Sequence, residues 1–295
     1  MLIIGLSLWV IPAAHSQTRT SIDAGRGPEI LLLPTDYEVS QPVPLIISLH
    51  GFGGTGASFA DYWEKSGQID RRTFMVSTPQ GRKDSKGKTF WNATDACCDK
   101  DKSGQDDSTY LRSLIEAIEA KYAIDPQQIH VSGYSNGGFM AHRMACDHAD
   151  KIASVLSIAG SVFADPEACQ PSEAVHVLQV HGMADPVIQY GGGGLKNYGS
   201  KARVSYPSAL DAVASWAIRN GLKGDPQSLP DLDLSSRIKG SETSVIRYGG
   251  AAASQPTVEL WSLRDEHHVP QLNDRFHAHS TDWLLDHAKA AKPKP

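Results

Sequence analysis

The sequence predicts one α/β domain in which helices cover both faces of a mostly parallel central sheet. Two observations indicate this fold class. Short apolar runs rich in Ile, Val and Leu recur along the chain, as the strands of a sheet buried on both faces require. Segments with helical periodicity separate these runs, and such alternation is typical of α/β proteins. The length of 295 residues is compatible with a single domain of this type.

The expected elements follow one another along the chain. Strands are expected at residues 29–33, 44–49, 74–77, 129–132, 153–158, 175–180 and 257–263. Helices are expected at residues 107–122, 136–146, 208–220 and 278–287. Asp106 or Asp107 can cap the first helix, because a carboxylate there accepts hydrogen bonds from unpaired backbone N–H groups.

Two stretches interrupt this order. Residues 191–194 are four glycines that follow a strand, and residues 221–240 are rich in Pro, Gly, Asp and Ser. Neither is followed by the pattern of a separate core, so we interpret both as irregular loops on the loop face of the domain. The walls of a substrate pocket are expected to come from them.

Residues 1–16 predict a cleaved secretory signal peptide. The apolar stretch at residues 2–12 is too short to cross a hydrocarbon core of about 30 Å as a helix. Ala14 and Ser16 are small residues at the positions that a signal peptidase reads. A buried N-terminal strand is the alternative interpretation. We therefore expect an exported protein, extracellular or periplasmic, with its domain at 17–288, a flexible tail at 289–295 and no membrane-spanning segment.

The charge balance argues against a nucleic-acid partner. The chain has 28 Lys and Arg residues against 33 Asp and Glu residues, a formal net charge of −5. Proteins that bind nucleic acids instead carry clustered basic residues, which contact the phosphates. We expect neither a nucleic-acid nor a membrane partner, and we expect a monomer.

The four cysteines are expected to form disulfides, because an exported protein folds under oxidising conditions. They are Cys97, Cys98, Cys146 and Cys169, and they allow three pairings among which the sequence does not choose. A bond between the adjacent Cys97 and Cys98 is geometrically awkward. We therefore favour a pairing in which each of these two reaches one of the distant cysteines.

A nucleophilic serine is indicated by the sequence Gly-Tyr-Ser-Asn-Gly at residues 133–137. It follows the expected strand at 129–132 and precedes the expected helix at 136–146. At such a junction the glycines permit a sharp turn that raises the serine hydroxyl above the sheet. Ser135 is therefore the candidate nucleophile.

A serine hydroxyl needs a histidine to take its proton and a carboxylate to orient that histidine. In chains with this serine motif the acid and the histidine follow later strands, in that order. Asp185 follows the strand at 175–180, and His267 and His268 follow the strand at 257–263. Either histidine lies in the correct loop.

Two backbone N–H groups are expected to stabilise an oxyanion. One belongs to Asn136, the residue after the serine, at a helix N-terminus where the helix dipole also favours negative charge. The other is expected from the glycine-containing loop after an early strand, Leu-His-Gly-Phe-Gly-Gly at residues 49–54, where Phe52 is the natural donor.

At these residues the chain resembles the secreted esterases of the polyhydroxybutyrate depolymerase and feruloyl esterase type. The matching pieces are the loop at 49–54, Trp-Asn at 91–92 with Cys-Cys at 97–98, Asp-Asp at 106–107, Ser-Asn-Gly-Gly at 135–138 with the cysteine at 146, and His-Gly at 181–182 with Asp-Pro at 185–186. The resemblance implies an α/β-hydrolase fold without a large cap domain. It also implies a triad of Ser135, Asp185 and His267, with Phe52 and Asn136 as oxyanion donors.

The chain departs from that family around the histidine. The family usually has a glycine-rich run, then the histidine, then a Trp-Pro pair two residues on. Here Arg-Asp-Glu at 264–266 replaces the glycines and Val269 replaces the tryptophan. Aligning Pro270 selects His267 over His268 as the base, with His268 as the alternative. The missing tryptophan removes an aromatic wall from the substrate pocket.

Three further features have competing interpretations. Trp91 either lines the acyl pocket or packs in the core, and Tyr134, beside the nucleophile, is a second candidate for the pocket, although packing beneath the turn is the simpler reading of its ring. Residues 99–104 resemble the start of a calcium loop, but Tyr110 stands where such a loop needs a glutamate. A solvated loop without metal is the expectation there.

Together these residues predict a secreted serine esterase that forms an acyl-enzyme on Ser135 and needs no cofactor or metal. The resemblance implies a small or polysaccharide ester as substrate, either a feruloyl or acetyl ester of plant polysaccharide or a short hydroxyalkanoate ester. The chain ends soon after its last helix, which favours soluble esters over solid polyester. A serine peptidase of the same fold and a non-catalytic secreted binding protein are the alternatives.

Overall fold

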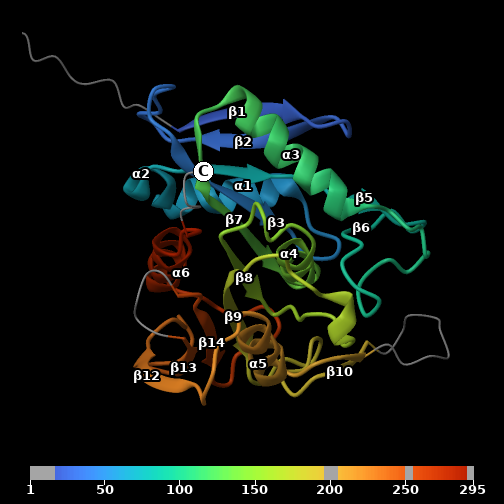
Figure 1. The fold of residues 1–295 in the computed structure, drawn as a ribbon, viewed down its shortest axis with the longest axis vertical. Helices are drawn as coiled ribbons and strands as arrows, with labels where there is room; N and C mark the ends of the chain where they lie inside the picture. Colours follow the sequence, from blue (N-terminus) through green and yellow to red (C-terminus); the bar gives the residue numbers. More distant parts are fainter. Residues whose placement is uncertain (1–16, 196–204, 250–254, 291–295) are drawn as a thin grey trace, which may run out of the picture.

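The computed structural model describes residues 17–195, 205–249 and 255–290. A ten-stranded sheet runs through the molecule in the order β1-β2-β4-β3-β7-β8-β9-β14-β13-β12 (Figure 1). In chain order these strands are β1 Thr18–Asp23, β2 Pro28–Leu33, β3 Val43–Leu49, β4 Met75–Thr78, β7 Ile124–Tyr134, β8 Ser154–Ile158, β9 His176–Gly182, β12 Gln227–Leu232, β13 Thr243–Tyr248 and β14 Val258–Leu263. The six central strands from β4 to β14 are parallel, and two antiparallel strands extend the sheet at each end.

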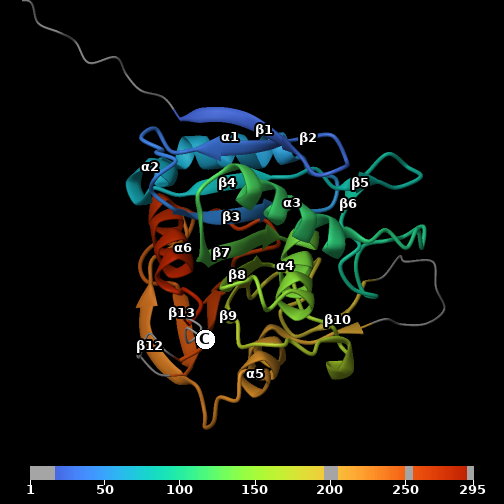
Figure 2. The same cartoon turned by 45° about the horizontal axis from the view of Figure 1, so that its top comes forward.

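Within the described residues, six helices cover the sheet, three on each face (Figures 1 and 2). One face carries α1 Gly56–Ser66, α2 Gln68–Arg72 and α6 Asp274–Asp286, and the other carries α3 Asp107–Lys121, α4 Asn136–Asp147 and α5 Ala209–Arg219. Short pieces complete the described fold: the hairpin of β5 Arg82–Lys83 and β6 Thr89–Phe90, the pair of β10 Gly193–Gly194 and β11 Ser205–Tyr206, and the 3-10 helix η1 Pro166–Ala168.

Alternation along the strands divides the core into two layers. In β3 the side chains of Leu45 and Ile47 join the cluster under α3, α4 and α5, while that of Ile46, between them, joins the cluster under α1, α2 and α6. Successive side chains of a strand point to opposite faces, so a strand covered on both sides must be apolar throughout. This explains why the parallel strands appear in the sequence as short continuous apolar runs.

The seven expected strands and the four expected helices are all present, with ends that differ by a few residues. The elements that the pattern did not predict are β1, α1, α2, the antiparallel strands β12 and β13, and the short pieces β5, β6, β10, β11 and η1. Of these, β10 lies in the segment 191–194, predicted as an irregular loop. The segment 221–240, predicted as an irregular loop, contains β12, which pairs with β13 at the edge of the sheet. Side chains of β12 are mostly exposed, so neither an apolar run nor a clear alternation marks it.

The two ends of the chain fall partly outside the described residues. The predicted signal peptide at 1–16 and residues 291–295 of the predicted tail are not described. Lys289, predicted as the start of that tail, is held instead. Its ammonium pairs with Glu173 at 2.7 Å and its backbone N–H donates to the carbonyl of Gln127 at 2.9 Å. Within the described ranges, no helix has the length and apolar character needed to span a bilayer.

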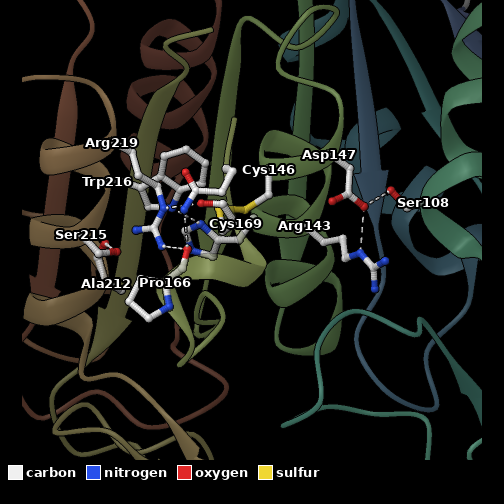
Figure 3. The surroundings of a disulfide bond; sticks show 12 residues. Ser108, Arg143, Cys146, Asp147, Pro166, Cys169, Ala212, Ser215, Trp216 and Arg219 are labelled. Carbon is white, nitrogen blue, oxygen red and sulfur yellow. Dashed lines mark hydrogen bonds and ion pairs between the residues drawn. A yellow bond between two sulfur atoms is a disulfide. The ribbon is translucent and has the colours of Figure 1, made fainter. Parts of the chain in front are cut away.

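Two disulfides are present, in a pairing that corrects the favoured one. Cys146 at the end of α4 bonds to Cys169 after η1, where the Cα atoms are 4.9 Å apart (Figure 3). Cys97 and Cys98 bond to each other, across a cis peptide bond. The fold brings the two distant cysteines together, which leaves the adjacent pair as the remaining partners.

Candidate active site

Ser135 stands in a tight turn between β7 and α4. Its φ of 54° lies in the left-handed region, which is unfavourable for a residue with a side chain and is often found at functional sites. A Cβ atom on Gly133 would lie 2.0 Å from the carbonyl oxygen of Gly137, and one on Gly137 would lie 2.2 Å from that of Leu49. Both glycines of the motif are therefore required because the backbone segments pass too close for a side chain.

The structure joins Ser135, His268 and Asp185 in a hydrogen-bonded triad. The Nε2 atom of His268 lies 2.9 Å from the Oγ of Ser135, and its Nδ1 lies 2.7 Å from the Oδ2 of Asp185. Asp185 follows β9 and His268 follows β14, which are adjacent parallel strands. Their carboxyl ends therefore meet at the same edge of the sheet as the turn after β7.

The carboxylate of Asp185 is buried, and both of its oxygens accept hydrogen bonds. Its Oδ1 accepts the backbone N–H groups of Val187 at 2.7 Å and Ile188 at 3.0 Å. Burial opposes the negative charge, yet the hydrogen bond from His268 and the nearby N–H of His181 outweigh it and hold the pKa of Asp185 well below its ordinary value. The carboxylate is therefore ionised at neutral pH.

The geometry corrects the choice between the two histidines, because His267 is exposed and His268 faces Ser135. The preceding side chain explains this. Glu266 is buried and accepts hydrogen bonds from the hydroxyl of Ser235 at 2.6 Å and from the backbone N–H of Gln271 at 3.2 Å. With Glu266 held in the interior, the side chain of His267 points outward and that of His268 points inward, toward Ser135.

The loop at 50–54 lies against the serine turn because β3 and β7 are neighbours in the sheet. The loop is held by Gly53, whose N–H donates to the carbonyl of Thr89 at 2.8 Å, and by Trp91, whose indole donates to the carbonyl of His50 at 3.0 Å. Burial lowers the pKa of His50, so its ring is neutral and accepts the N–H of Gly81 at Nε2. The backbone of Phe52, the predicted oxyanion donor, is carried by this braced loop.

The side chain of Asn136 clamps the backbone of Trp91. Its Oδ1 accepts the N–H of Trp91 at 2.7 Å, and its Nδ2 donates to the carbonyl of the same residue at 2.9 Å. Because Asn136 is fully buried, this double contact fixes the residue whose backbone N–H is the other predicted oxyanion donor. The clamp links the serine turn to the segment that carries the Cys97–Cys98 disulfide, since Asn136 Nδ2 also lies 3.5 Å from the Sγ of Cys97.

The two predicted pocket residues have other roles in the structure. Trp91 is fully buried, so it belongs to the core and does not line a pocket. Tyr134 is partly buried, and its hydroxyl donates to the backbone carbonyl of His268 at 2.9 Å. Its ring also packs against the ring of His268, with the centroids 5.4 Å apart. Tyr134 thus supports His268. The two residues are far apart in the sequence, so no local pattern predicts this contact.

The carboxylates of the segment considered as a calcium loop accept hydrogen bonds from the segment itself and from Ser85. The carboxylate of Asp99 accepts the backbone N–H groups of Ser103 and Gly104, both at 2.9 Å. Asp101 accepts the N–H of Ser85 at 2.5 Å and its hydroxyl at 2.8 Å. In the part of the chain that the structure describes, His, Cys, Asp and Glu side chains do not gather in a group of three or more that could hold a metal ion.

Comparison with known sequences places this site in a family. The family model described as phospholipase/carboxylesterase matches residues 38–201. Feruloyl esterase B of Piromyces equi is 27% identical over 205 residues, which are 67% of this chain and 36% of that protein. Poly(3-hydroxyalkanoate) depolymerase C of Paucimonas lemoignei is 29% identical over 124 residues, 41% of this chain and 28% of that protein. The chain thus spans about a third of these relatives.

Solved structures share the fold at low sequence identity. The acetyl xylan esterase from Aspergillus awamori superposes with a TM-score of 0.66 at 12% identity, covering 92% of this chain and 99% of that one. The native structure of pOPH gives a TM-score of 0.52 at 16% identity, covering 96% and 91%. The fold is the expected α/β-hydrolase fold, and the resemblance to feruloyl esterases and polyhydroxyalkanoate depolymerases is confirmed. The chain therefore belongs to the phospholipase/carboxylesterase family of α/β hydrolases.

Proposed function

We propose that this protein is a serine esterase that hydrolyses carboxylic esters through an acyl-enzyme on Ser135. The observation that carries the proposal is the position of His268, which is within hydrogen-bond distance of both Ser135 and Asp185. A histidine held between a serine hydroxyl and a buried carboxylate is the arrangement that activates a serine for acyl transfer. Family membership independently supports carboxylic esters as the substrates.

The reaction follows from the triad. His268 accepts the proton of Ser135 as the Oγ atom attacks the ester carbonyl, and Asp185 stabilises the imidazolium that forms. The oxyanion of the tetrahedral intermediate accepts hydrogen bonds from the backbone N–H groups of Phe52 and Asn136. His268 then donates the proton to the leaving alcohol. Water, activated by the same histidine, hydrolyses the acyl-enzyme and restores the serine.

The substrate class is proposed from the relatives and from the loops that carry the triad. Feruloyl esterase and poly(3-hydroxyalkanoate) depolymerase relatives support feruloyl or acetyl esters of plant polysaccharide, or short hydroxyalkanoate esters. Met183, Val187 and Val269 lie within two residues of Asp185 or His268 and keep large exposed apolar side chains. Apolar side chains so close to the triad support an ester with an apolar group near its carbonyl.

Export and domain organisation belong to the same proposal. Two disulfides support folding in an oxidising compartment, so residues 1–16 are proposed as the export signal and residues 17–288 as the catalytic domain. Expression in a secreting host, followed by mass measurement of the exported protein, tests this directly. Export of a chain that retains residues 1–16 would contradict the signal.

Hydrolysis of p-nitrophenyl acetate and butyrate by the purified protein tests the mechanism. We expect Ser135→Ala and His268→Ala to lower kcat/KM by at least about 10³-fold, because each removes a group that acts in the transition state. The matched controls, Ser113→Ala on the exposed side of α3 and His267→Ala, retain activity. Full activity of Ser135→Ala would refute the mechanism, and loss of activity only in His267→Ala would refute the assignment of the base.

A panel of substrates then tests the class. Methyl ferulate, acetylated xylan and hydroxybutyrate oligomers separate the proposed acyl groups, and a peptide amide tests for peptidase activity. If the protein cleaves only the peptide amide, the proposed esterase activity is wrong and the protein is a peptidase. A protein that binds one of these esters without turning it over would replace it by a binding protein.

A further inference from the structure

A buried chain of polar side chains reaches the triad from behind. It runs from Trp216 on α5 through His142 on α4 to Gln179 and His181 on β9, and all four side chains are buried. The reaction proposed above uses none of them. Buried polar groups are costly unless they are hydrogen-bonded, so a continuous buried chain that ends at Asp185 calls for an explanation.

Trp216 sets the direction of this chain, because an indole N–H can donate a hydrogen bond but not accept one. Its Nε1 lies 3.0 Å from the Nδ1 of His142, so this nitrogen must be the acceptor. Burial lowers the pKa of His142 to about 4, which keeps its ring neutral at pH 7. The one ring proton is therefore on Nε2, and it is donated to the Oε1 of Gln179 at 2.9 Å.

Gln179 fixes the direction of the next hydrogen bond, the one to His181. Its Nε2 donates to the carbonyl of Gly160 at 2.9 Å and faces the Nδ1 of His181 at 3.2 Å. Because a carbonyl can only accept, Gly160 independently confirms which end of the amide is nitrogen. The Nδ1 of His181 is thus an acceptor, and in the neutral ring the proton is on Nε2.

The far end of the chain requires the same tautomer. The Nε2 of His181 lies 2.8 Å from the carbonyl of Ile188, which can only accept, and 3.5 Å from the Oδ2 of Asp185. The opposite tautomer would direct the lone pair of Nε2 at both oxygens and would be repelled by them. Donor-only and acceptor-only groups at the two ends therefore fix every proton between them.

We propose that His181 is a positioning residue of the triad, held by this hydrogen-bond chain as the Nε2–H tautomer. Its N–H, donated to the carbonyl of Ile188, also faces Asp185 Oδ2 and keeps the carboxylate turned toward His268. The proposal rests on the proposed esterase function. Asp185 Oδ1 is held by two backbone N–H groups, and Oδ2 receives His268 at 2.7 Å while it faces His181. With donors on both oxygens, the carboxylate can neither rotate nor take up a proton without losing a bond.

The Trp216 end of the chain is anchored as well. Arg219, one turn along α5, donates to the carbonyl of Cys169 at 2.9 Å, and Cys169 is bonded to Cys146 on α4 (Figure 3). The disulfide thereby ties α5 to the helix that carries His142. The disulfide and the charge-assisted hydrogen bond of Arg219 therefore keep Trp216 and His142, the first two residues of the hydrogen-bond chain, next to each other.

NMR of the wild-type protein with ¹⁵N-labelled histidine tests the proposal without any assay of activity. At pH 7 the ring nitrogens of His142 and His181 are expected to show a protonated Nε2 and an unprotonated Nδ1. A protonated Nδ1 on His181, alone or together with Nε2, would overturn the proposal. Because the measurement does not depend on catalysis, it remains decisive if p-nitrophenyl ester assays refute the esterase function.

Kinetics on the same esters separate positioning from packing. We expect His181→Phe, which keeps a planar ring but removes the N–H, to lower kcat by about tenfold with KM nearly unchanged, because the hydrogen bond to Ile188 and the N–H that faces the charged carboxylate are both lost. His181→Gln, which restores an N–H donor, should recover most of that loss. Unchanged kcat in His181→Phe, or no recovery in a folded His181→Gln, would overturn the proposal.

The matched control is His130→Phe. His130 is as deeply buried as His181, but its ring nitrogens contact Ser154 at 2.8 Å and Gln128 at 2.9 Å rather than the triad. Its replacement should leave kcat unchanged even where it lowers the thermal unfolding midpoint. Equal losses of kcat in the two phenylalanine variants would show that a buried ring matters only for packing and would also overturn the proposal.

Discussion

Acidification should destabilise this protein because several of its histidines are buried in the neutral form, and for three of them burial lowers the pKa strongly. Burial lowers the pKa of His130 to about 3 and those of His142 and His176 to about 4, from an ordinary value of 6.5. For His130 and His176 the nearby His287 adds to the effect. The unfolded chain can charge all three in water, whereas the folded protein would have to bury each charge.

The direction and size of the effect follow from proton linkage. Below pH 6.5 the unfolded chain binds more protons than the folded protein, so the free energy of unfolding decreases as the pH falls toward the folded pKa values. Each pH unit by which the pH falls in this window lowers the free energy of unfolding by about 1.4 kcal/mol per histidine. At pH 5 each of the three removes about 2 kcal/mol, and together they remove about 6 kcal/mol, comparable to the whole stability of many domains. Above pH 6.5 this stability is fully present.

Urea unfolding followed by tryptophan fluorescence at pH 8 and pH 5 measures the difference. In His130→Phe the loss of stability between the two pH values should be smaller than in the wild type by about 2 kcal/mol, because one buried titrating group is gone. His279→Gln, at an exposed position of α6, should leave the loss unchanged because its ring is in water in both states. The same pH dependence in wild type and His130→Phe would refute the reasoning.

Three other predictions concern the serine turn and the disulfide. Gly133→Ala should abolish esterase activity and lower the thermal midpoint, since its Cβ would lie 2.0 Å from the Gly137 carbonyl; a fully active, stable variant would contradict the close approach. Tyr134→Phe, which removes the hydrogen bond to the backbone of the proposed base, should cost about 1 kcal/mol in transition-state stabilisation, measured as kcat/KM with p-nitrophenyl acetate; unchanged kcat/KM would show that the hydroxyl does not position the histidine. Replacing Cys146 and Cys169 together by alanine opens a loop with a sequence separation of 23 residues and should lower the free energy of unfolding by about 3 kcal/mol, measured by urea titration; a change below about 1 kcal/mol would contradict the constraint.

Features that depend on neighbouring residues could be predicted from the sequence. Strands buried on both faces need continuous apolar runs, and the turn at 133–137 needs glycines where backbones touch, so both leave a local signature. The edge strand β12 and the short helix α2 have no such local signature. Most of their side chains face water, so burial does not require apolar residues at regular positions.

Features decided by contacts between distant residues could not be predicted. His268 rather than His267 faces Ser135 because Glu266 is held by Ser235, a contact across 31 residues of chain. The disulfide pairing depends in the same way on where α4 and η1 come to lie.

The sequence by itself determined the α/β fold class, the Ser135 turn and the order in which serine, acid and histidine occur, because each depends on residues close together in the chain. Only the tertiary structure decided which histidine faces the serine and which cysteines bond. It also decided that Trp216, 74 residues from His142, directs a buried hydrogen-bond chain toward Asp185. The physical reason is that side-chain direction and proton position are set by packing partners and by donor and acceptor geometry, which exist only once the chain has folded.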